Sequence, residues 1–175
     1  MTYVTHSLGG VAAGLALVHV SGISEPVTLA YVAAGALVGS LLPDIDHTRS
    51  KISNKNIITN TISHLVSIFF KHRGFLHTPV FLAILFVVIY VGVGMIPVRI
   101  SAFHLAAAIL LGALSHLILD SLTPGGIMWL WPFTKKKINF ASIKTSSISE
   151  RIFAGAFAVL IAYLFIEHDI SSVLF

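Results

Sequence analysis

The chain has 175 residues, of which 56% are hydrophobic and only 10% are charged, whereas a typical soluble domain carries about 25% charged residues. This composition, with a mean hydropathy of +0.93, excludes an ordinary soluble domain and predicts a single integral membrane domain over residues 1–175. The absence of cysteine excludes a disulfide framework, a thiolate metal site and a cysteine nucleophile.

Five apolar segments predict an all-α fold, a polytopic membrane bundle of about five transmembrane helices. Several are shorter than the ~20 residues of a full span, and the first could be half-buried or re-entrant. Apolar residues at helical spacing from Ile58 to Phe69 predict an additional amphipathic helix at the membrane interface. In chain order, the five segments run from Ser7 to Val20, Pro26 to Leu42, Thr78 to Ile96, Ile100 to Leu122, and Ile152 to Ile166.

Small residues are unevenly shared among these five segments. Glycine, alanine and serine are frequent in the first, second and fourth, whereas the third and fifth are rich in bulky apolar residues. Small side chains let helix backbones approach closely within lipid. We therefore expect the first, second and fourth helices to form the inner bundle, with the other two facing lipid.

The basic residues predict how the chain is oriented in the membrane. The second-to-third and fourth-to-fifth connections each carry five lysines and arginines, so the positive-inside rule places both in the cytoplasm. The N-terminus is then cytoplasmic and the C-terminus outside, and the net charge of +4 reflects topology rather than a nucleic-acid partner. The ten residues are Arg49, Lys51, Lys55, Lys71 and Arg73, then Lys135, Lys136, Lys137, Lys144 and Arg151.

Histidines and aspartates gather at the ends of the apolar segments, where charges are costly unless they are paired or bind metal. His116 and Asp120 are four residues apart and therefore share one helix face, as chelating pairs do. The predicted topology brings four separate motifs to one membrane face. They are His6 before the first segment, Asp44, Asp46 and His47 after the second, His72 and His77 before the third, and His116 with Asp120 in the fourth.

Oxygen and nitrogen donors in this combination suit one or two divalent ions. We expect His6, Asp44, His77, His116 and Asp120 to be direct ligands. Asp46, His47 and His72 would complete a second metal site or orient the ligands. Each motif also has a structural interpretation, because the aspartate turn could end a helix and His116 with Asp120 could be a buried hydrogen-bonded pair.

The order of these motifs resembles the YdjM-like family of LexA-regulated, membrane-bound, metal-dependent hydrolases. The resemblance covers almost the whole chain. The family in turn is distantly similar to the zinc-dependent phospholipase C and P1 nuclease group. The matching stretches are Thr5-His6, Leu42-Pro-Asp-Ile-Asp46, His72-Arg-Gly-Phe-Leu-His-Thr78, Ser115-His-Leu-Ile-Leu-Asp-Ser-Leu-Thr-Pro124, and Trp131-Pro132.

The resemblance implies an inner-membrane enzyme that uses one to three divalent ions, zinc foremost and manganese as the alternative. It implies hydrolysis of a phosphoester in a membrane lipid or another amphiphile. The planar donors of Arg73 suit a phosphate, and Asp46 could accept a proton from the attacking water. The alternatives are a lipid esterase or amidase, and a non-enzymatic metal-binding or structural membrane protein.

Overall fold

The structure is a computed structural model that describes residues 1–46, 74–97 and 100–174. Within these ranges the regular elements are helices, together with one isolated bridge between Ile127 and Ile138. They are α1 (Tyr3–Val20), α2 (Pro26–Leu41), the 3-10 helices η1 (Leu42–Asp46) and η2 (Phe75–His77), α4 (Pro79–Gly94), α5 (Ala102–Ser121) and α6 (Ile148–Leu174). The amphipathic helix predicted from Ile58 to Phe69 lies outside the described residues.

The predicted membrane bundle is confirmed. Four helical stretches are long and apolar enough to cross a membrane: Tyr3–Val20, Pro26–Ile45, Ala102–Ser121 and Ile148–His168. The remaining apolar helix, α4, has 16 residues and is therefore about 24 Å long. This is shorter than the roughly 30 Å hydrocarbon core, so α4 spans the membrane only where the bilayer thins locally.

Two helix boundaries differ from the prediction because polar residues at both starts are included in the helices. The first helix begins at Tyr3 rather than Ser7, so His6 lies in its first turns and not before it. The fifth begins at Ile148 and ends at Leu174, instead of running from Ile152 to Ile166. The segment around Asp44 forms the 3-10 helix η1, which follows the end of α2 directly and runs through Pro43.

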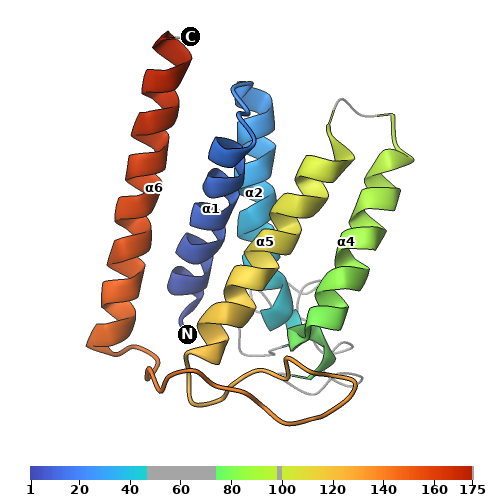
Figure 1. Ribbon diagram of the computed structural model, residues 1–175, viewed down its shortest axis with the longest axis vertical. Helices are drawn as coiled ribbons and strands as arrows, with labels where there is room; N and C mark the ends of the chain where they lie inside the picture. The colour runs from blue at the N-terminus through green and yellow to red at the C-terminus, as the bar shows by residue number, and fades with distance from the viewer. Residues whose placement is uncertain (47–73, 98–99, 175) are drawn as a thin grey trace, which may run out of the picture.

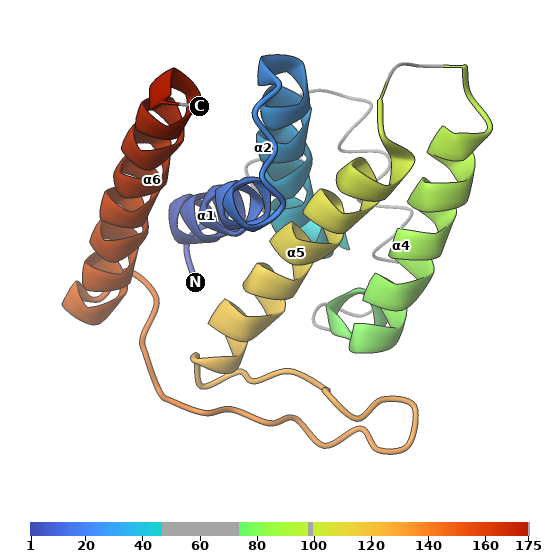
Figure 2. The same cartoon turned by 45° about the horizontal axis from the view of Figure 1, so that its top comes forward.

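The inner bundle consists of α1, α2 and α5, as the small residues predict. Figure 1 and Figure 2 show α6 and α4 on opposite sides of these three helices. A Cβ added to Gly112 would lie 2.0 Å from the Ala36 carbonyl oxygen, and one added to Gly39 would lie 2.1 Å from that of Ile109. Only glycine therefore permits the observed approach of α2 to α5.

The helix ends are arranged so that one end of the bundle collects the polar motifs. Figure 1 shows the starts of α1, α4 and α6 and the ends of α2 and α5 at the same end. Side chains cap several of these helices, as Thr78 does for α4 by accepting a hydrogen bond from the Phe81 amide. The two chain termini lie at opposite ends of the bundle (Figure 1).

Candidate metal centre

The structure brings together five of the predicted ligands. His6 comes from α1, Asp44 from η1, His77 from η2, and His116 and Asp120 from α5. The three histidines and Asp120 are at most 2% exposed, and the Asp44 side chain is 26% exposed. Buried groups of this polarity are stable only with compensating partners, so their convergence is a structural feature that needs an explanation.

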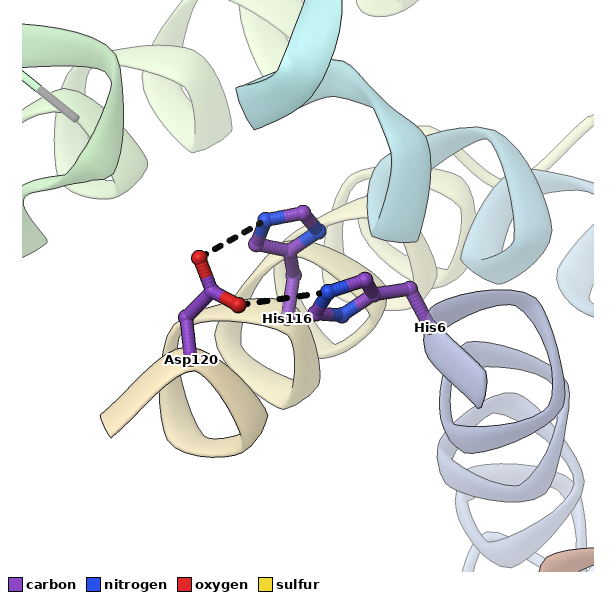
Figure 3. A group of neighbouring side chains, drawn as sticks. All are labelled: His6, His116 and Asp120. Carbon is purple, nitrogen blue, oxygen red and sulfur yellow. Dashed lines mark ion pairs between the residues drawn. The ribbon is translucent and has the colours of Figure 1, made fainter. Parts of the chain in front are cut away.

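The first group consists of His6, His116 and Asp120 (Figure 3). Asp120 Oδ1 lies 3.3 Å from His6 Nε2, and its Oδ2 lies 3.8 Å from His116 Nε2. The two imidazole rings stack with centroids 3.8 Å apart and an interplanar angle of 15°. The single carboxylate therefore faces both rings, one through each oxygen.

The second group consists of Asp44, His77 and His116. Asp44 Oδ1 lies 3.6 Å from His77 Nε2 and 3.7 Å from His116 Nε2. In each of the two groups, all ligand atoms lie within 4.8 Å of one another. His116 belongs to both groups and is the centre of the cluster.

The hydrogen bond made by Nδ1 of His116 determines whether Nε2 carries a proton in the neutral ring. Nδ1 lies 2.7 Å from the Ser40 carbonyl oxygen, which can only accept, so Nδ1 carries the proton and donates it. In a neutral imidazole, Nε2 then presents a lone pair. Nε2 is buried without a hydrogen-bond partner among the described residues, and it faces the Asp44 and Asp120 carboxylates.

His116 Nε2 and the two carboxylates that it faces require positive charge nearby. The α-amino group of Met1 supplies one such charge beside Asp120, and a proton on Nε2 or a metal ion would supply another. A charged hydrogen bond from an imidazolium to a carboxylate is ordinarily about 2.7–2.9 Å long, and the His116 separations are 3.7 and 3.8 Å. Tetrahedral zinc with bonds of about 2.0–2.1 Å separates neighbouring donors by roughly 3.3–3.4 Å. The two His116 separations are therefore longer than a direct charged hydrogen bond and also longer than the spacing of donors around zinc.

The shared histidine also limits how ions could be divided between the two groups. Since Nδ1 is committed to Ser40, His116 has one lone pair and can bind one ion. The two groups therefore cannot both contain His116 as a ligand at the same time. The α-amino group of Met1 lies 2.9 Å from Asp120 Oδ1, so a positive group already accompanies this carboxylate.

Four of the predicted site residues receive no placement from the structure. His47, His72 and Arg73 lie outside the described residues. Asp46 closes η1, but its side chain belongs to the part that is not described. Their suggested roles remain predictions from the sequence.

One buried polar residue beside the centre was missed by the sequence analysis. Glu150 of α6 is 2% exposed and accepts hydrogen bonds from the Thr2 amide, the Thr5 hydroxyl and the Ser146 amide. The available signal was the Ser147-x-x-Glu150 pattern, which is typical of a helix N-terminus. Serine 147 indeed accepts a hydrogen bond from the Glu150 amide.

An apolar groove of about 260 Å³ lies between α1, α5 and α6. Its lining includes Gly9, one turn along α1 from His6, and Leu119, which precedes Asp120. Ser115 is the polar residue of the lining, and its hydroxyl donates to the Gly112 carbonyl of its own helix. The groove therefore offers an apolar surface within the membrane-spanning part of the bundle.

The model of the YdjM inner membrane protein family matches residues 1–171. The chain belongs to this family. It is 38% identical over 165 residues to the uncharacterized protein YvsG of Bacillus subtilis (strain 168), covering 94% of each chain. It is 33% identical over 105 residues to the inner membrane protein YdjM of Escherichia coli (strain K12), covering 58% of this chain and 50% of that protein.

The inner membrane protein YdjM of Shigella flexneri shows the same 33% identity over 105 residues. No solved structure matches the chain. Membership of the YdjM family and the apolar helices together identify an integral protein of the inner membrane.

Proposed function

We propose that this protein is a metal-dependent hydrolase whose active site is the buried cluster at one end of the bundle. The observation that carries the proposal is His116, whose Nε2 lone pair faces two carboxylates while Nδ1 donates to Ser40. Three helical elements, α2, η1 and α5, contribute to this arrangement, so a purely local role in ending one helix does not account for it.

The donor set suits a borderline or hard divalent cation. Imidazole nitrogens and carboxylate oxygens are the usual ligands of zinc and manganese, and the chain has no cysteine that would favour softer ions. A divalent ion bound here would supply the acidification of a water molecule and the polarisation of a phosphoryl oxygen. Zinc is the first candidate and manganese the second.

The protein residues would divide the remaining work. His6, Asp44, His77, His116 and Asp120 would hold the cation. From the sequence, Asp46 is the candidate to accept the proton of the attacking water, and Arg73 the candidate to hold the substrate phosphate through its planar donors. His47 and His72 would orient the ligands or belong to a second ion.

Two observations support a membrane amphiphile as the substrate and the cytoplasm as the side of reaction. The apolar groove beside α1 and α5 has a volume of about 260 Å³, less than the roughly 300–1,000 Å³ of sites that enclose a whole small ligand. It therefore suits part of an acyl chain. The lysines and arginines in the two long connections favour a cytoplasmic location for the same end of the bundle.

Purified protein provides the decisive test. After reconstitution with zinc or manganese, we expect elemental analysis to find bound metal, and a panel of phospholipids and lipid phosphates to include a hydrolysed substrate. Asp44→Asn should abolish turnover. His104→Ala, which changes a histidine near the opposite end of α5, is the matched control and should retain it.

Each result separates the proposal from its alternatives. Protein that binds neither metal after reconstitution would refute the metal centre. Metal binding with cleavage of carboxylic esters or amides, and none of phosphoesters, would favour a lipid esterase or amidase. Metal binding without turnover of any substrate would favour a metal-binding or structural membrane protein.

A further inference from the structure

Glu150 connects the start of α6 with the start of α1. Its Oε1 accepts hydrogen bonds from the Thr2 amide and from the Thr5 hydroxyl, the latter at 2.8 Å. Its Oε2 accepts one from the Ser146 amide. A single buried carboxylate therefore receives donors from two segments, Thr2 to Thr5 and Ser146, that are far apart in the chain.

This arrangement substitutes for a cap that α1 lacks. The first turn of α1 contains no acidic residue, and its N-cap, Thr2, makes no side-chain capping hydrogen bond within the described structure. The first amides of a helix have no partner inside it and carry its positive end. Glu150, from another helix, supplies an acceptor to one of these amides, that of Thr2, and a negative charge beside the positive end of α1.

The same turn carries a ligand of the candidate metal centre. His6 is the fourth residue of α1, and its amide makes one of the first helical hydrogen bonds, to the Thr2 carbonyl at 3.2 Å. Thr5 contacts Glu150, while the adjacent His6 side chain stacks on His116 of α5. Helix termini fray unless they are held, and the Thr5–Glu150 hydrogen bond holds this turn to α6.

We propose that Glu150 is a positioning residue, which with Thr5 holds the first turn of α1 so that His6 is preorganised for metal. This inference builds on the proposed function. Residues that orient metal ligands typically affect metal affinity by about 10- to 100-fold. Glu150 does not touch the candidate centre itself and acts through Thr2 and Thr5.

Isosteric substitutions test the proposal. Glu150→Gln replaces one acceptor oxygen by a donor, and Thr5→Val removes the hydroxyl with little change of shape. We expect both to weaken zinc binding by about 10-fold or more, measured by competition with a chelator on the purified full chain. Thr5→Ser keeps the hydroxyl and should restore affinity to near the wild-type value.

Glu25→Gln is the matched control, because Glu25 also caps a helix through its carboxylate, accepting from the Val27 and Thr28 amides at the start of α2. It should leave zinc affinity unchanged. A purely structural role of Glu150 predicts a lower melting temperature with unchanged zinc affinity of the folded protein, and that result would overturn the proposal. So would a failure of Thr5→Ser to restore binding.

Amide hydrogen exchange separates this inference from the proposed function. We expect Glu150→Gln to accelerate exchange in residues 3–9 of the metal-free protein and to leave the start of α2 unchanged. Equal exchange in wild type and variant would refute the role of Glu150 even if zinc binds. If wild-type protein binds no metal, the proposed function fails, whereas the exchange comparison still decides whether Glu150 holds α1.

Discussion

Replacing His116 with asparagine separates the roles of its two ring nitrogens. The amide group of asparagine occupies nearly the place of Nδ1, so it can still donate to the Ser40 carbonyl, which His116 Nδ1 reaches at 2.7 Å. It offers nothing in the place of Nε2. His116→Gln does the reverse, because its longer amide reaches the place of Nε2 and leaves Ser40 without its donor.

The expected magnitude follows from binding linkage. At a free zinc concentration 100 times the dissociation constant, wild-type protein gains about 2.7 kcal/mol of folding free energy. If loss of Nε2 raises the dissociation constant by about 100-fold, the His116→Asn variant gains only about 0.4 kcal/mol at the same concentration. At roughly 2–4 °C per kcal/mol, the zinc-induced rise in melting temperature should fall from about 5–11 °C to about 1–2 °C.

The assay is thermal unfolding of purified protein in detergent, with and without zinc. Without zinc, His116→Gln should be the less stable variant, since a buried carbonyl that loses its donor costs about 1–3 kcal/mol. His116→Asn should stay closer to wild type but lose the response to zinc. A His116→Asn variant that responds to zinc as wild type does would refute Nε2 as a ligand.

Three further predictions concern packing, substrate and orientation. Gly112→Ala should lower the free energy of unfolding by about 1–3 kcal/mol or more through overpacking, measured by thermal unfolding, whereas Gly92→Ala, which has open space around it, should not destabilise. Ala13→Leu, in the groove, should reduce turnover of long-chain substrates without changing zinc affinity. Ala34→Leu, at an exposed position, should change neither turnover nor zinc affinity. Equal turnover in the wild type and both variants would exclude the groove as the binding site of the acyl chain. Because the chain has no cysteine, Lys136→Cys gives a background-free reporter that an impermeant thiol reagent should label only after permeabilisation; labelling of intact cells would reverse the orientation.

The helices, and the convergence of the candidate ligands at one end of the bundle, could be predicted because both depend on local sequence patterns. Long apolar runs define the membrane helices, and alternating crossings then bring alternate helix ends to one face. The i, i+4 spacing of His116 and Asp120 needed only helical geometry. The orientation of the chain was inferred from lysines and arginines alone and remains a prediction.

The boundaries that were predicted wrongly depend on contacts between distant residues. Thr5 and Glu150 are polar, so both were assigned to the connections between helices. In the structure the Thr5 hydroxyl donates a hydrogen bond of 2.8 Å to the Glu150 carboxylate inside the bundle. This pairing lets α1 begin at Tyr3 and α6 at Ile148. A single sequence contains no signal for a hydrogen bond across 145 residues, so the start of α1 could not be predicted from local pattern. The start of α6 did have a local signal, the Ser147-x-x-Glu150 capping pattern.

The glycines of the inner bundle and the candidate ligands form one structural feature. Gly112 lies one turn before His116 on α5, and Gly39 precedes Ser40 on α2. The close approach that these glycines permit brings the Ser40 carbonyl within 2.7 Å of His116 Nδ1. That hydrogen bond fixes the tautomer of the neutral ring, in which Nε2 presents a lone pair toward Asp44 and Asp120. The small residues thus do more than pack the helices, because the spacing they allow determines which atom of His116 is available to a metal.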